Sequence, residues 1–106
     1  MTGTDLMEPE QQYQFEAELW VYAGAKAAWH FITVPADISH SLSFFAGSTN
    51  GFGSIRVRVG IGESRWETSV FPDKASGCYF LPVKAAVRKA ERISTGDRVE
   101  VELSTG

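Results

Sequence analysis

Cysteine is almost absent from this sequence, in which Cys78 is the only one among 106 residues. A single cysteine excludes an internal disulfide and is typical of proteins from a reducing compartment. No apolar run approaches the roughly 20 residues that cross a membrane as a helix. No early segment has the basic-then-apolar order of a signal peptide either. Together these absences predict a soluble, cytoplasmic protein with no membrane partner.

An excess of positive charge is also missing, since the formal net charge is −3 at pH 7. This balance argues against a general nucleic-acid-binding protein. The charges are unevenly spread: residues 1–52 hold one basic and six acidic residues, and residues 53–106 hold nine basic and seven acidic ones. We therefore expect any anion-binding surface to lie in the second half.

The familiar motifs of catalysis and metal binding are missing as well. His30 and His40 with one cysteine do not provide the three or four converging ligands of a metal site. The glycine-containing segment 47–53 lacks the Gly-Lys-Ser/Thr ending of a phosphate-binding loop, and no serine lies in a nucleophile elbow. We therefore expect no cofactor, no metal and no catalytic residue, and we interpret Cys78 as a small buried residue.

What the sequence does contain is a regular alternation of apolar and polar residues, the pattern of half-buried β-strands. The segments with this alternation, or with a short apolar and β-branched composition, are residues 13–22, 27–34, 54–61, 65–70, 78–81 and 98–103. Short strands at regular spacing favour a small closed or nearly closed barrel. We predict an all-β fold in a single domain over residues 13–104, after a flexible tail over residues 1–12.

Two short helices are expected between the strands, each beginning near a proline. The first is predicted over residues 36–46 and the second over residues 83–93. The residues expected on the buried faces are Ile38, Leu42 and Phe45 in the first helix and Val83, Ala86, Val87, Ala90 and Ile93 in the second. The residues expected to face water in the first helix are Ser39, Ser41 and Ser43. Trp20, Trp29 and Trp66 are interpreted as core residues, although Trp20 could serve as a contact residue.

Four stretches of the second half carry a family likeness, namely residues 53–57, 66–72, 81–91 and 96–99. In order and spacing they resemble the bacterial domain family DUF1905, and a weaker likeness extends back to Tyr13. The resemblance implies a small six-stranded double-split β-barrel. It implies no established activity or catalytic residue. Some relatives carry a second domain of the YdeI/OmpD-associated type, which we expect this chain to lack.

A looser similarity covers residues 81–103. This stretch is similar to the strand-helix-strand unit of AbrB-type transcription regulators, which pair two short chains into one barrel and bind DNA. Here one chain is long enough to supply the whole barrel. The similarity therefore suggests a shared architecture, from which function does not follow.

Two candidate sites follow from these patterns. The first is a small-ligand site around the loop at residues 71–79, and its candidate residues are Trp29, Ser69, Phe71, Lys74 and Tyr79. The second is an anion or nucleic-acid surface on the basic helix, and its candidate residues are Lys84, Arg88, Lys89 and Arg92. Each has a plainer interpretation, because the aromatic residues could be core and the basic residues could be paired with nearby carboxylates.

The favoured function is a non-catalytic module that binds an unknown small molecule or protein, as a monomer or a homodimer. One alternative is a nucleic-acid-binding regulator that uses the basic strand-helix-strand unit. A second alternative is an enzyme that uses scattered carboxylates, for which no acid or base can be named.

Overall fold

The computed structural model describes residues 11–24, 26–46 and 53–105. The elements, in chain order, are β1 (Gln12–Ala23), β2 (Ala28–Thr33), α1 (Ala36–Ala46), β3 (Ile55–Ile61), β4 (Ser64–Pro72), β5 (Tyr79–Pro82), α2 (Ala85–Glu91) and β6 (Arg98–Ser104). The expected tail lies outside the described residues except for 11 and 12, and Gln12 already begins β1. The expected glycine-containing loop lies outside them except for Gly53.

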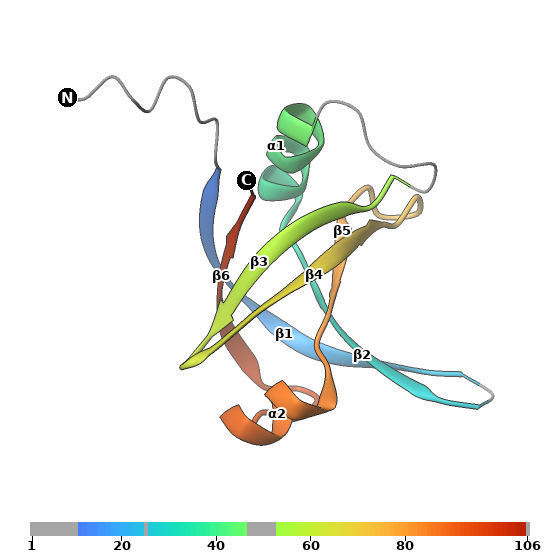
Figure 1. The fold of residues 1–106 in the computed structure, drawn as a ribbon. Helices are drawn as coiled ribbons and strands as arrows, with labels where there is room; N and C mark the ends of the chain where they lie inside the picture. Colours follow the sequence, from blue (N-terminus) through green and yellow to red (C-terminus); the bar gives the residue numbers. More distant parts are fainter. Residues whose placement is uncertain (1–10, 25, 47–52, 106) are drawn as a thin grey trace.

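The strands form one closed antiparallel barrel in the order β1-β2-β5-β4-β3-β6 (Figure 1). This confirms the expected all-β barrel with six strands and two short helices. The long strand β1 pairs with two strands: Gln12–Glu18 pairs with β6, and Leu19–Ala23 pairs with β2. In Figure 1 the far end of the β1–β2 hairpin projects beyond the rest of the barrel.

The alternation in the sequence places one apolar face of each strand inside the barrel. The side chains with less than 2% of their surface exposed include Leu19, Ile32, Val34, Leu42, Val70, Leu81, Val101 and Leu103. Full burial of such a side chain contributes about 1.5–3 kcal/mol to folding. The barrel is therefore filled by its own side chains, and a ligand site has to lie in its wall or on its surface.

Helix α1 has the predicted bounds but is rotated relative to the predicted face. Ser39 is buried, whereas Phe45 is 53% exposed, so the expectation for these two residues was wrong. The Ser39 hydroxyl donates to the Val34 carbonyl (2.9 Å) and accepts from the Tyr79 amide (3.0 Å). Because both hydrogen bonds replace water, the helix can turn this polar residue inward.

Ser41 also departs from its predicted place in water. Its Oγ lies 2.6 Å from the hydroxyl oxygen of Tyr13, and the serine is half-buried. The hydrogen bond ties α1 to the first residues of β1. Of the three serines, only Ser43 is exposed as expected.

Helix α2 is shorter than the predicted range of 83–93. The Val83 amide donates to the His30 carbonyl (2.9 Å), which keeps residue 83 attached to β2. Lys84 is extended (φ −71°, ψ 159°), so the helix begins only after it. At the other end Arg92 takes the left-handed conformation (φ 57°) and stops the helix.

The apolar stripe expected on this helix is correspondingly narrow. Val87 is buried and Ile93 is half-buried, whereas Ala86 and Ala90 are exposed. This short helix presents only one side to the barrel, and the two exposed alanines lie on its other side.

The three tryptophans are not all core residues. Trp29 is 56% exposed, which overturns its assignment to the core, and Trp20 and Trp66 are half-buried. Trp29 pairs with Tyr22 near the end of the β1–β2 hairpin, which projects beyond the rest of the barrel (Figure 1). Cys78 is a free, half-buried thiol, so it is less enclosed than expected.

Candidate functional site

The outer surface of the barrel is divided between two kinds of residue. The outward residues are charged or polar where β1 pairs with β6 and across β3 and β4, and we call this surface the charged face. Its main members are Glu16, Glu18, Arg56, Arg58, Arg65, Glu67, Arg98, Glu100 and Glu102. Where β1 pairs with β2, and across β5, the outward residues are aromatic; we call this the aromatic face, formed by Trp20, Tyr22, Trp29, Phe31, Phe71 and Phe80.

Ion pairs connect different strands on the charged face, two between neighbouring strands and one, Arg65–Glu102, across β3 from β4 to β6. The guanidinium–carboxylate distances are 3.8 Å for Arg56–Glu67 and 3.7 Å for both Arg65–Glu102 and Arg98–Glu16. All six side chains are more than half exposed. Pairs of this kind contribute about 0–1 kcal/mol each, so this face is solvated and largely neutralised by itself.

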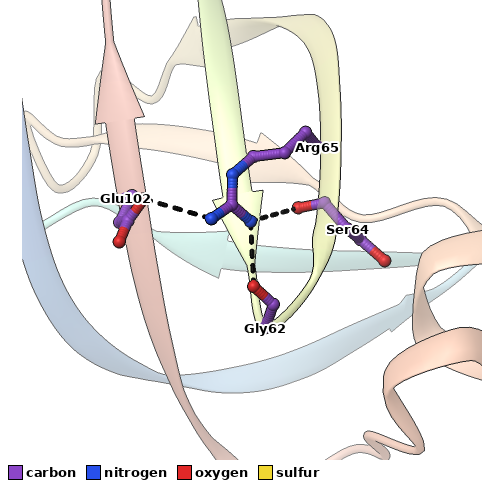
Figure 2. Close-up of polar contacts among 4 residues, drawn as sticks. All are labelled: Gly62, Ser64, Arg65 and Glu102. Atoms are coloured by element: carbon purple, nitrogen blue, oxygen red, sulfur yellow. Dashed lines mark hydrogen bonds and ion pairs between the residues drawn. The ribbon is translucent and has the colours of Figure 1, made fainter.

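A furrow of about 510 Å³ crosses the charged face at Gly60. A Cβ at this glycine would lie 3.0 Å from the Arg65 guanidinium, so the missing side chain makes room for the arginine. Figure 2 shows Arg65 held by the Gly62 carbonyl (2.9 Å), the Ser64 carbonyl (3.0 Å) and the Glu102 carboxylate. Arg65 already has two carbonyl acceptors and one carboxylate within the chain, so it does not need a bound anion to neutralise it.

A second contact connects α2 to the β3–β4 hairpin. Ser64 Oγ donates to the Glu91 carboxylate (2.6 Å), and a Cβ added at Gly62 would overlap that carboxylate. Gly62 also has a positive φ of 57°, which favours glycine. Glu91 is therefore a positioning residue for α2, although its sequence position suggested a partner for the basic residues of the helix.

The aromatic face is packed within itself. Ring centroids lie 5.2 Å apart for Trp20–Phe31, 4.9 Å for Trp20–Phe80 and 6.4 Å for Trp29–Phe31. The Trp20 indole also donates to the Thr33 hydroxyl (2.9 Å). Aromatic pairs at these distances contribute about 0.5–1.5 kcal/mol beyond burial, so this arrangement has a structural role whether or not a partner covers it.

A pocket of about 340 Å³ opens in the barrel wall at the edge of the aromatic face, and we call it the wall pocket. Its lining residues are Ala27, Ala28, Trp29, His30, Trp66, Glu67, Thr68, Pro82, Val83, Lys84 and Arg88. The pocket exists because β5 has only four residues and pairs with β4 at only Phe80 and Tyr79. The beginning of β2 and the middle of β4 therefore have no strand between them.

His30 and Arg88 form the polar end of the wall pocket. Arg88 Nη1 lies 3.5 Å from His30 Nε2, and Arg88 Nε donates to the Val83 carbonyl (3.1 Å). A guanidinium can only donate, so Nε2 is the acceptor and the proton of the neutral imidazole sits on Nδ1. That Nδ1 is buried and has no hydrogen-bond partner within the described part of the chain.

The pKa of His30 is lowered from its ordinary value of 6.5, first by burial and second by the charge of Arg88. Both causes disfavour the imidazolium. His30 is therefore neutral at pH 7, and the positive charge at this end of the pocket belongs to Arg88.

Arg88 has no compensating carboxylate among the residues whose positions are defined. It is half-buried, and it forms no ion pair with any residue in 11–24, 26–46 or 53–105. Glu67 lines the same pocket but lies 3.8 Å from Arg56. With Lys84 exposed at the rim, the wall pocket combines an apolar lining with uncompensated positive charge.

The structure divides the candidate ligand residues among four places. Trp29 lines the wall pocket, whereas Lys74 and Tyr79 line another pocket, of about 380 Å³, beside α1. Phe71 is 46% exposed on the aromatic face opposite Phe80. Ser69 pairs across the sheet with Arg56 and lines neither pocket.

The candidate anion residues are divided as well. Arg88 and Lys84 line the wall pocket, while Lys89 and Arg92 are exposed elsewhere on and after α2. His30 and Trp66 are the pocket residues that sequence reasoning missed as ligand contacts. The available signal was a histidine next to Trp29 within an apolar strand, but its meaning depends on which residues lie opposite.

Groups of metal-ligating side chains and membrane-spanning helices are both absent from the part of the chain with defined positions. No three His, Cys, Asp or Glu side chains among those residues could hold a metal ion together. Neither helix there has the length and apolar character needed to span a bilayer.

Comparison with known proteins identifies a family. The sequence profile of DUF1905, described as a domain of unknown function, matches residues 15–103. This match confirms the resemblance found in the sequence, over nearly the same range. A search of curated proteins gave no match to the chain.

Proposed function

The chain belongs to the DUF1905 family, and we propose that it is a non-catalytic binding module that holds a small ligand in the wall pocket. The family description names no activity, so the proposal rests on the geometry of the pocket. Sites for small ligands are concave, mainly apolar and supplied with a few polar groups. The wall pocket has these properties at a volume of about 340 Å³.

The observation that carries the proposal is the half-buried charge of Arg88 at one end of this pocket. Its Nε and Nη1 meet the Val83 carbonyl and a neutral histidine, and no carboxylate pairs with it among the described residues. Charges that are partly removed from water are as a rule paired or hydrogen-bonded, and a guanidinium has five N–H donors. A ligand that brings acceptors to the remaining donors completes their hydrogen bonding.

The chemistry of the lining favours binding over catalysis. An acid–base mechanism needs at least two converging titratable groups with matched roles. Here His30 faces an arginine, and the nearby Glu67 is held by Arg56. This arrangement orients and neutralises a ligand more readily than it transfers a proton.

The test is a ligand screen by thermal shift, followed by variants of the pocket. A ligand bound only by the native state raises the melting temperature, and we expect Arg88→Gln to remove most of that rise. Lys89→Gln removes the same charge from the same helix outside the pocket and should leave the rise unchanged. If both variants respond equally, or ligands act equally on Trp29→Ala, the pocket is not the site.

A nucleic-acid-binding role is the second candidate, and one observation favours it. Lys84, Lys89 and Arg92 are exposed, while Glu91 is turned away from them toward Ser64. Phosphate contacts make affinity fall steeply with salt. Loss of oligonucleotide binding in the triple variant Lys84→Gln, Lys89→Gln, Arg92→Gln would support this role, and no binding at about 50 mM salt would exclude it.

A further inference from the structure

The charges around the wall pocket indicate the charge of the ligand that it would bind. Arg88 and Lys84 are the cations of its lining, and Glu67 is its one carboxylate, already paired with Arg56 at 3.8 Å. A cationic ligand would meet uncompensated positive charge, and a neutral ligand would leave Arg88 as it is. An anion neutralises the arginine and replaces the water lost on burial.

The shape of the free donors narrows the choice to an anionic group that presents two oxygens side by side. Of the five N–H donors of a guanidinium, Arg88 uses Nε for the Val83 carbonyl and one on Nη1 for His30. The remaining donors form part of a planar fork, which matches the two oxygens of a carboxylate or of a phosphate. His30 Nδ1 is closed off from solvent, so a ligand meets Arg88 first and reaches the imidazole only if its ring turns.

The rest of the lining selects the body of the ligand. Trp29, Trp66, Pro82 and Val83 supply apolar surface next to the cations. A volume of about 340 Å³ lies at the lower end of the range for small-molecule sites, roughly 300–1,000 Å³. This volume suits a compound of one or two rings, and aromatic linings favour flat rings over flexible chains.

We infer that the wall pocket binds a small aromatic anion, with its rings against Trp29 and Trp66 and its acidic group on Arg88 and Lys84. This inference rests on the proposed function and names the ligand class for the same site. The shared requirement is a flat apolar body with one anionic group, and carboxylate and phosphate forms are separate arms of the test. A contact with the anion also favours protonation of His30, because it offsets the repulsion from Arg88.

The experiment compares three probes that have the same ring and different charge. Binding of 2-naphthoate, neutral 2-naphthamide and cationic 2-naphthylmethylamine to the full chain is measured by titration calorimetry at pH 7.5. We expect the naphthoate to bind at least about tenfold more tightly than the amide, because only the acid brings a negative charge and two acceptor oxygens to the guanidinium. The amine should bind most weakly. A parallel titration with 2-naphthyl phosphate shows which acidic group is preferred.

Variants tie the preference to the named residues. Arg88→Gln should reduce naphthoate affinity about tenfold, to that of the amide, without changing amide affinity. Lys84→Gln at the exposed rim should reduce naphthoate affinity by roughly threefold. This variant replaces Arg88→Gln as the test if the arginine variant folds poorly. Lys89→Gln is the matched control and should bind naphthoate like the parent chain.

The possible failures are distinguishable. Equal affinity for naphthoate and amide, with both lost in Trp29→Ala, overturns the anion inference and leaves the proposed function standing. Tighter binding of the amine also overturns the inference. If none of the probes binds and a wider metabolite screen finds nothing at this pocket, the proposed function fails with it.

Discussion

On the charged face, Arg56, Arg65 and Arg98 each lie 3.7–3.8 Å from a carboxylate on another strand. At the edge of the aromatic face, Arg88 has no carboxylate within the defined residues, and its guanidinium lies 3.5 Å from a neutral histidine. Both regions belong to the same small barrel. They differ in whether a strand supplies a carboxylate partner.

The difference follows from strand length. The β3–β4 pair holds seven residue pairs in register, so each outward side chain has a cross-strand neighbour. The β4–β5 pair holds two, and the sheet is interrupted where β5 ends. Polar groups beside the interruption, His30 among them, lose the neighbours that would have satisfied them. A short strand thus creates the candidate site.

The largest effect should come from breaking the contact that positions α2. Gly62→Ala places a Cβ where the Glu91 carboxylate lies, so that carboxylate has to leave Ser64, and it adds strain at a positive φ. We expect a loss of about 2–4 kcal/mol in unfolding free energy, from strain plus a broken part-buried hydrogen bond. Chemical denaturation measures the loss.

The matched control for this change is Gly77→Ala. Gly77 also has a positive φ, 76°, but a Cβ there would meet nothing within 4 Å. Its cost should be backbone strain alone, about 1 kcal/mol. Equal losses in the two variants would contradict a positioning role for Glu91.

A second prediction concerns the buried hydroxyl of α1. Ser39→Ala leaves the Tyr79 amide and the Val34 carbonyl without their partner. The expected loss is about 1–3 kcal/mol in unfolding free energy. Ser43→Ala on the exposed side of the same helix should change stability by less than about 0.5 kcal/mol. A neutral Ser39→Ala would mean that the helix is not held as described.

The pH dependence of stability tests the electrostatics of the wall pocket. His30 has a lowered pKa in the folded state, so the unfolded chain takes up a proton first as the pH falls through 6.5. The stability supported by the neutral imidazole is complete above that pH and is lost below it. Melting temperatures from pH 7.5 to 5 should therefore fall more for the parent chain than for His30→Gln. His40→Gln, at an exposed residue of α1, should follow the parent.

The smallest effect is expected on the charged face. Glu102→Gln removes the carboxylate 3.7 Å from Arg65 but leaves the two carbonyl acceptors of that arginine in place. The pair is exposed, so the loss should be no more than about 1 kcal/mol and should vanish at high salt. Denaturation at low and high salt measures this loss. A larger loss would show that the Arg65–Glu102 pair in the furrow at Gly60 contributes more to stability than an exposed ion pair does.

The barrel was predictable because alternation is a local property of the sequence. Ile55, Val57, Val59 and Ile61 point inward as their spacing predicts, and the second helix was found although its ends were misplaced. The prediction failed where an outcome depends on which residues lie opposite. Ser39 is buried because Val34 and Tyr79 meet it there, and Trp29 is exposed because its hairpin outruns the barrel.

Only part of the candidate site could be predicted from the sequence. Trp29, Lys84 and Arg88 were named, but in two separate sites. His30 was considered only as a metal ligand, since nothing local indicates that an arginine 58 positions away approaches its Nε2. The length of β5 and the register around it bring these residues together, and neither can be read from a four-residue segment.

The most direct test of the account is an NMR map of where a small aromatic anion binds. The full chain is titrated with 2-naphthoate while the indole N–H signals of Trp20, Trp29 and Trp66 and the Arg88 Nε–H signal are followed. Binding in the wall pocket predicts saturable shifts at Trp29, Trp66 and Arg88, with Trp20 nearly unchanged. Shifts confined to Trp20, or to residues around Lys74, or no saturable shift at all, would contradict the claim that the wall pocket is the binding site.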